Sequence, residues 1–183
     1  MLTSVPRGRS VAPPARRSVD PQEIAARLAP AIRWPGAPDV EERSWRLVAL
    51  TPEFDAWVIA WPRGGSVDLH APGRSRGALV VLEGALVETT PWRDDTGRLT
   101  LRGEKLAEGS TRRFARGHVH DVRNVAESTA VSLHVYHPPL TSMTSYELAG
   151  NQLVRSAVHH PQEWDGSAAA SSDDAGALRS TAL

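Results

Sequence analysis

Apolar residues recur at every second position in short runs along the middle of the chain. These runs are rich in Val, Leu, Trp and Thr, as half-buried β-strands are. Turn residues separate the runs, and no helical pattern alternates with them. The spacing predicts an all-β fold, an antiparallel barrel or jelly roll. The predicted strands are Ser44 to Leu50, Phe54 to Trp61, Ser66 to His70, Ala78 to Glu83, Ala85 to Thr90, Arg98 to Leu101, Val119 to Arg123 and Thr129 to Tyr136.

One short helix is predicted ahead of the strands. Asp20 suits the N-cap and Pro21 the first helical position, and the helix ends near Pro30 or by Pro35. The segments 1–19 and 166–183 carry Pro, Arg, Ser, Ala and Gly without periodicity and are predicted to be disordered. We therefore expect a single domain over residues 20–165.

Composition narrows the possible partners and chemistry. Lys and Arg number 21 and Asp and Glu 21, so no excess positive charge exists to bind nucleic acid. No apolar stretch approaches the ~20 residues that span a bilayer, and the N-terminus lacks the apolar centre of a signal peptide, so a cytoplasmic protein is expected. The chain has no cysteine, so a metal site would have to use His, Asp or Glu.

The run from Ala130 to Tyr136 carries polar residues on one face. A period of two places Ser132, His134 and Tyr136 together and the intervening Val and Leu residues on the opposite face. A surface strand would leave that polar face in water. Alternatively, hydroxyl, imidazole and phenol at this spacing can form a hydrogen-bonded relay that fixes the direction of the phenol.

Histidines at two other places are candidate metal ligands. His118 and His120 are spaced to lie on one strand face, where they could reach either a metal or solvent. Their candidate partner is His70, which ends a run in which Asp68 shares its face. The remaining histidines, His137, His159 and His160, are predicted to lie in loops or in the tail.

Two groups of these residues resemble a known family. Gly65 to His70 followed by Gly77 to Gly84 resembles the first motif of the cupin superfamily. His120 to Asn124 and Ser132 to Leu140 resemble the second half of bacterial type I cysteine dioxygenases. The similarity extends over about residues 43–146 and implies a cupin jelly-roll barrel. It also implies a mononuclear Fe(II) held by three histidines, where a small thiol and O2 form a sulfinic acid.

The resemblance assigns roles residue by residue. His70 and His120 match the metal ligands, and Tyr136 matches the phenol above the iron, with His134 and Ser132 orienting it. The arginine that holds the substrate carboxylate matches Arg46, with Arg43 as the second choice. Gly77 stands where animal members have a cysteine crosslinked to the tyrosine.

One position departs from the family pattern. The second histidine of the first motif falls on Pro72, which offers no ligand atom. Asp68 could complete a two-His-one-carboxylate site, or His118 could supply the missing ligand. The third alternative is weak or absent metal binding, in a non-catalytic cupin that binds a small carboxylate or thiol. Oxidation of cysteine is the favoured activity, with mercaptopropionate as a related substrate whose enzymes carry glutamine in the place of the arginine.

Overall fold

The computed structural model describes residues 19–34 and 39–160, and within them the chain forms eleven strands. Their bounds are β1 Ser44–Leu50, β2 Asp55–Trp61, β3 Ser66–Ala71, β4 Arg76–Glu83, β5 Ala85–Arg93, β6 Leu99–Ala107, β7 Thr111–Phe114, β8 His120–Asn124, β9 Ala130–His137, β10 Met143–Ala149 and β11 Gln152–His159. The predicted disordered segments lie outside the described residues, apart from residue 19.

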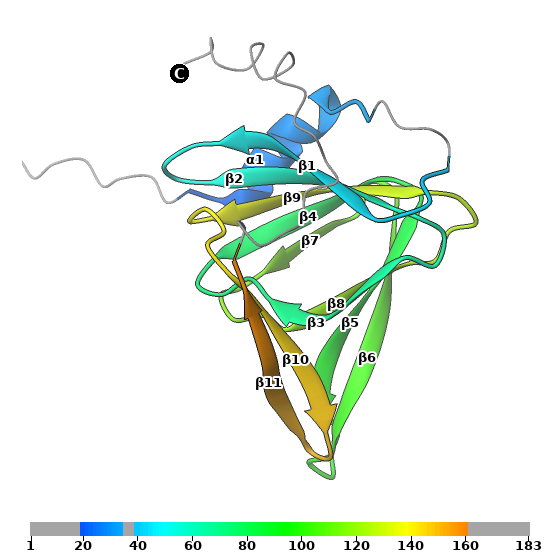
Figure 1. Ribbon diagram of the computed structural model, residues 1–183, viewed down its shortest axis with the longest axis vertical. Helices are drawn as coiled ribbons and strands as arrows, with labels where there is room; N and C mark the ends of the chain where they lie inside the picture. The colour runs from blue at the N-terminus through cyan, green and yellow to red at the C-terminus, as the bar shows by residue number, and fades with distance from the viewer. Residues whose placement is uncertain (1–18, 35–38, 161–183) are drawn as a thin grey trace, which may run out of the picture.

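The strands form two antiparallel sheets that face each other (Figure 1). The five-stranded sheet has the order β1-β2-β9-β4-β7, and the six-stranded sheet has the order β11-β10-β3-β8-β5-β6. A core that includes Trp61, Leu79, Leu86 and Val122 lies between them. The predicted all-β class with a short N-terminal helix is confirmed.

Three strands, β7, β10 and β11, were not predicted from the sequence. β7 contains two arginines in four residues, and most side chains of β11 are exposed. Both strands lie at the edge of a sheet. An edge strand buries few side chains, so its sequence need not alternate between polar and apolar residues.

The helix α1, Pro21–Leu28, covers the outer face of the five-stranded sheet (Figure 1). The Asp20 side chain caps it by accepting a hydrogen bond from the Gln22 amide at 3.0 Å, as the sequence predicts. A 3₁₀ turn, Ala29–Ala31, follows it. Ala25 is fully buried against the sheet, and Asp20 also forms an ion pair with Arg113 of β7.

Strand β9 lies at the centre of the five-stranded sheet, between β2 and β4. Its Val131, Leu133 and Val135 side chains pack in the cluster beneath α1. Its other face, which carries Ser132, His134 and Tyr136, is also buried. The strand is therefore covered on both sides, and the alternative of a polar face in water is wrong.

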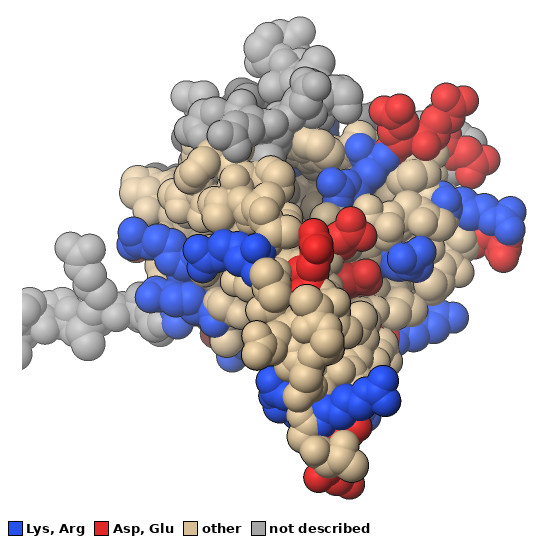
Figure 2. All heavy atoms as spheres, turned by 60° about the horizontal axis from the view of Figure 1, so that its bottom comes forward, with Lys and Arg blue, Asp and Glu red and all other residues tan. Residues whose placement is uncertain are grey.

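The hairpins β5–β6 and β10–β11 extend beyond the rest of the barrel into a tapered end (Figure 1). Basic and acidic side chains both occur on this end, as Figure 2 shows. Among the described residues, no helix is both long and apolar enough to cross a membrane.

Candidate functional site

His70 and His120 lie opposite each other on the neighbouring strands β3 and β8. Both side chains are buried, and their ring centroids are 4.6 Å apart. The Nδ1 atom of His70 is 2.8 Å from the Asp68 carbonyl oxygen, and Nδ1 of His120 is 2.8 Å from Glu88 Oε1. Both acceptors require a proton on Nδ1, so each ring keeps its lone pair on Nε2. Among the described residues, neither Nε2 atom has a hydrogen-bond partner.

A β-bulge in β3 produces this pairing. Val67 pairs with Val122 and His70 pairs with His120, so β3 has one residue more than β8 between the two pairs. The extra residue lets Val67 and His70 face the same interior, although strict alternation would separate them. Asp68, which strict alternation places beside His70, is exposed instead. The structure therefore does not bring the Asp68 carboxylate to the two histidines.

Burial keeps the histidines of this region neutral. Desolvation, together with the neighbouring His120, lowers the pKa of His70 to about 3. Desolvation also lowers the pKa of His120, although its hydrogen bond to Glu88 acts in the opposite direction. A neutral imidazole with a free lone pair is the form that a metal ion requires.

A second group of ligand-type side chains lies on the other side of His120. Glu88 Oε1 is 2.9 Å from His118 Nε2 and 2.8 Å from His120 Nδ1, and their candidate ligand atoms all lie within 4.8 Å. This group of Glu88, His118 and His120 could hold a metal ion. Arg112 forms an ion pair with the same carboxylate, Nε lying 2.9 Å from Oε2. Burial would raise the pKa of Glu88, but hydrogen bonds from both histidines outweigh it and lower the pKa to about 2.

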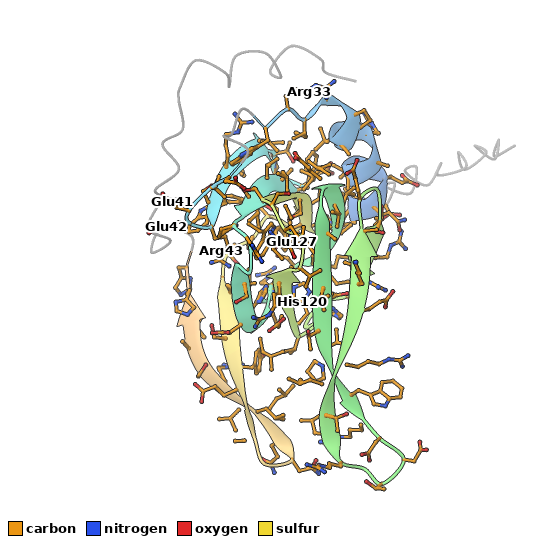
Figure 3. All side chains as sticks on the ribbon, turned by 90° about the vertical axis from the view of Figure 1, so that its right-hand side faces the viewer. Arg33, Glu41, Glu42, Arg43, His120 and Glu127 are labelled. Carbon is orange, nitrogen blue, oxygen red and sulfur yellow. The ribbon has the colours of Figure 1, made fainter. Side chains whose placement is uncertain are left out.

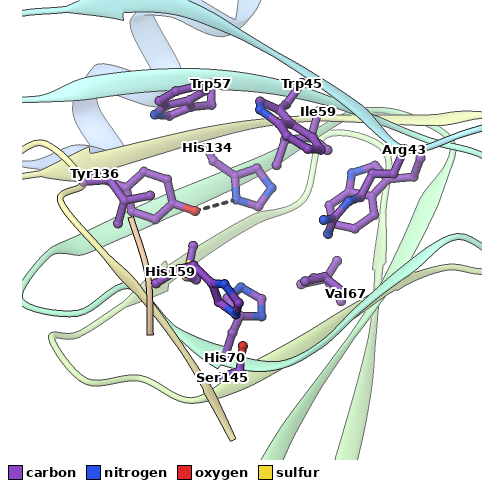
Figure 4. Close-up of a pocket in the computed structure, with 14 residues that line it drawn as sticks. Arg43, Trp45, Trp57, Ile59, Val67, His70, His134, Tyr136, Ser145 and His159 are labelled. Carbon is purple, nitrogen blue, oxygen red and sulfur yellow. Dashed lines mark hydrogen bonds between the residues drawn. The ribbon is translucent and has the colours of Figure 1, made fainter. Parts of the chain in front are cut away.

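Ser132, His134 and Tyr136 form a hydrogen-bonded chain on β9. Ser132 Oγ is 2.9 Å from His134 Nε2, and the Tyr136 hydroxyl is 3.4 Å from His134 Nδ1 (Figure 4). Trp61 Nε1 donates to Ser132 Oγ at 2.9 Å. Ser132 Oγ can then donate its own proton to His134 Nε2, and in that tautomer His134 Nδ1 donates to the phenol oxygen. The phenol proton of Tyr136 remains available to donate into the cavity.

Electrostatics keep this chain uncharged. Burial lowers the pKa of His134 to about 3, so the ring is neutral near pH 7. Burial and the nearby Asp55 raise the pKa of Tyr136, so the phenol keeps its proton. The tyrosine is therefore a hydrogen-bond donor in this site, with its ring fixed by neighbours.

A cavity of about 300 Å³ opens between the sheets beside these groups (Figure 4). His70, His134 and Tyr136 line it, so the predicted residues of β3 and β9 meet at one cavity. His120 and Ser132 are buried behind them, and Figure 3 shows His120 between the two sheets. Three tryptophans form much of the wall: Trp45, Trp57 and Trp61.

Of the two candidate arginines, Arg43 lines the cavity and Arg46 does not. Arg43 shares its side of the chain with Trp45, which pairs with Ile59 of the cavity wall. Arg46 instead pairs with Val58, on the face that packs beneath the helix, and its guanidinium lies 5.8 Å from the Trp34 ring. It also donates to the carbonyl oxygen of Arg33, which Figure 3 places at the helix end of the molecule.

Pro72 directly follows β3 and is fully buried. Its carbonyl oxygen accepts the Ser75 amide at 2.9 Å in a tight turn. At Gly77 of β4, an added Cβ would overlap the Phe114 ring and lie 2.5 Å from the Val135 carbonyl oxygen. Phe114 packs against Tyr136 with ring centroids 5.7 Å apart. An aromatic ring thus occupies the space beside Gly77.

Sequence reasoning missed several residues around the cavity and behind it. Met143, Ser145 and His159 line the cavity from β10 and β11, and His159 ends a strand instead of lying in the tail. Glu88 was not predicted either; it is buried on β5, on the same face as the buried Leu86. Of the other two histidines expected in loops or the tail, His137 is instead the last residue of β9. His160 lies after β11, and its Nδ1 donates to the Thr141 carbonyl oxygen at 3.1 Å.

Comparison with known proteins identifies one family. A family model described as cysteine dioxygenase type I matches residues 18–149. Solved structures with similar folds include an oxalate oxidase in complex with glycolate, at 18% identity and TM-score 0.46 over 55% of this chain and 54% of that one. The Schizosaccharomyces pombe Cnp3 cupin domain matches at 12% identity and TM-score 0.45, over 52% of this chain and 60% of that one. The polyketide cyclase RemF from Streptomyces resistomycificus matches at 20% identity and TM-score 0.44, over 68% of this chain and 74% of that one.

Proposed function

Because the chain belongs to the cysteine dioxygenase type I family, we propose that it is a thiol dioxygenase with a mononuclear iron. The reaction is the oxidation of cysteine or a similar small thiol to its sulfinic acid. Both atoms of O2 are added to sulfur, which loses four electrons as the two oxygen atoms gain them. The thiol proton stays in the product as the acidic proton of the sulfinic acid.

The observation that carries this proposal is the pair of free Nε2 atoms on His70 and His120 beside the cavity. Each imidazole is oriented by an acceptor at Nδ1, an arrangement typical of histidines that bind metals. The Glu88, His118 and His120 group fits an ion less well, because both histidines already hydrogen-bond to Glu88 and its carboxylate also forms an ion pair with Arg112. We therefore assign the iron to His70 and His120, with Glu88 orienting His120.

The chain's own residues would bind and orient the substrate. The half-buried guanidinium of Arg43 forms no ion pair with a described carboxylate, so it is free to bind the substrate carboxylate. Tyr136 would donate its phenol proton to the reacting thiol or oxygen, with its direction set by His134 and Ser132. The tryptophan walls exclude water from the reactants. Bound iron would supply the Lewis acidity that deprotonates the thiol and the redox chemistry that activates O2.

Pro72 supports a second candidate function, a cupin that binds a small carboxylate or thiol without oxidising it. The buried proline supplies no third side-chain ligand after His70. In that case Arg43 and the cavity would still bind a ligand, but iron would not be retained.

The test measures iron content, thiol-dependent O2 uptake and sulfinic acid formation by mass spectrometry. The protein is purified after expression with iron, and cysteine and mercaptopropionate are both supplied. We expect iron in the wild type and its loss in His70→Ala. Arg43→Gln should raise KM for the thiol at least tenfold, whereas Arg46→Gln, a matched change outside the cavity, should leave it unchanged. Iron-free wild-type protein without O2 uptake would instead support the binding function.

A further inference from the structure

The walls of the cavity are much more apolar than cysteine requires. Besides Trp45, Trp57 and Trp61, the lining includes Ile59 of β2 and Val67 of β3. Its volume of about 300 Å³ reaches the lower end of the range for cavities that hold drug-sized ligands, roughly 300–1,000 Å³. Cysteine is far smaller than such ligands, and its single methylene group could contact only a small part of these walls.

The charge in the cavity favours a ligand with an anionic group. Arg43 is the single Arg or Lys side chain among the described lining residues, and its Cζ lies 5.5 Å from the Trp45 ring and 5.6 Å from the Trp61 ring. Two aromatic faces hold the guanidinium in place and reduce its contact with water, which strengthens its attraction for an anion. A carboxylate is the natural ligand for this end of the cavity.

The described lining of the same cavity has no carboxylate that could bind an ammonium group. No Asp or Glu occurs among its described lining residues. Asp68 is exposed and lies outside the lining, so its charge acts on Arg43 without an ion pair between them. The Asp55 carboxylate accepts the Leu140 amide and lines a separate hollow, with Trp57 and Leu140 between the two spaces. A protonated amine that entered the cavity would lose water without contacting a carboxylate of the described lining, which opposes its binding.

We propose that the preferred substrate is a thiol with one carboxylate and an amine-free apolar body larger than cysteine, such as an aryl-substituted mercaptocarboxylate. This inference rests on the proposed function for the oxidation itself, whereas its binding preference stands on the cavity alone. The carboxylate binds Arg43, and the apolar body contacts the tryptophan walls.

Binding to metal-free full-length protein tests the preference without any oxidation. β-Phenylpropanoate is the probe; phenylalanine differs from it by the ammonium group, and propanoate differs by the missing ring. Tryptophan fluorescence or calorimetry should show β-phenylpropanoate binding at least tenfold more tightly than either comparison compound. Arg43→Gln should weaken it at least tenfold, and Arg46→Gln should not. Val67→Phe, which fills part of the cavity, should weaken β-phenylpropanoate more than propanoate.

Oxidation by the iron-loaded protein then tests the proposed dioxygenase activity separately from the ligand preference. We expect kcat/KM for O2 uptake to be highest with α-benzyl-β-mercaptopropanoate, lower with β-mercaptopropanoate and lowest with cysteine. If β-phenylpropanoate binds as expected but no thiol is oxidised, the proposed function fails and the ligand preference stands. If phenylalanine binds as tightly as β-phenylpropanoate, or cysteine is the best substrate, the ligand preference is wrong even though the protein is a dioxygenase.

Discussion

Tyr136 shows how neighbouring side chains can define the direction of one proton. Trp61 donates to Ser132, Ser132 contacts His134, and His134 contacts the phenol oxygen. Each donor has an acceptor, so the phenol proton is the one that remains for a ligand. Because the 3.4 Å contact from His134 is long, its loss should cost little folding free energy.

Tyr136→Phe removes this proton donor while keeping the buried ring. We expect kcat for thiol-dependent O2 uptake to fall by roughly 10²-fold, the lower end of the range for a positioned proton donor, with a small change in Tm. Tyr146→Phe on β10 is the matched control, since that tyrosine does not line the cavity. Equal kcat in the two variants would assign Tyr136 to packing alone.

Pro72 stands where the family resemblance predicts a third metal ligand. Pro72→His would supply a side-chain ligand at the position that follows β3. We expect the variant to retain more iron per chain through dialysis against a weak chelator, measured by elemental analysis, because a third ligand raises metal affinity. Pro72→Ala controls for the loss of the proline ring. Stoichiometric iron in wild type, with no gain in Pro72→His, would mean that another residue completes the site.

At the scale of elements, the site depends on a bulge in one sheet and on a glycine in the other. The bulge in β3 turns His70 inward opposite His120 and leaves Asp68 outside. On the other sheet, Gly77 lets β4 approach the Phe114 ring of β7, which in turn packs against Tyr136. Small features of the strands therefore position side chains that come from both sheets.

Gly77→Ala tests the close approach at this glycine. The new Cβ would overlap Phe114 and lie 2.5 Å from the backbone oxygen of Val135, so the free energy of unfolding should fall by about 1–3 kcal/mol. Urea denaturation measures the loss. Combining the change with Phe114→Leu should recover only part of it, because the overlap with the β9 backbone remains. Full recovery in the double variant would show that the ring alone imposes the constraint.

At the scale of the whole molecule, the buried histidines connect stability to pH. His70 and His134 have pKa values of about 3, whereas an unfolded chain binds those protons near pH 6.5. Between these values the unfolded state holds more protons, so acid favours unfolding. Glu88, with its pKa lowered to about 2, acts in the same direction below about pH 4.5.

We therefore expect the metal-free protein to lose stability as the pH falls below 6.5. Each buried histidine contributes a slope of up to about 1.4 kcal/mol per pH unit to the free energy of unfolding. Urea denaturation at pH 7.5, 6.5 and 5.5 measures this slope. His134→Gln should reduce the slope by the contribution of one buried histidine, up to about 1.4 kcal/mol per pH unit. Constant stability from pH 7.5 to 5.5 would contradict this account.

The sequence by itself determined the features that depend on local alternation. The strands that bury one regular face, the capped helix and the shared face of Ser132, His134 and Tyr136 follow from a period of two or from the chemistry of capping. The predicted cupin resemblance also agrees with the family that matches residues 18–149. The strands and the helix could be predicted because residues close together in the sequence fix them.

Only the tertiary structure decided which residues meet across strands. The bulge in β3 shifts the alternation of its side chains by one residue. Asp68 therefore points to solvent, although regular alternation would place it on the same face as His70. The pairing of β1 with β2 places Arg43 in the cavity and Arg46 beneath the helix. Glu88 and His159 enter the surroundings of the site from distant strands. Register and sheet order set these contacts, because they depend on the packing of many residues and not on any short stretch of sequence.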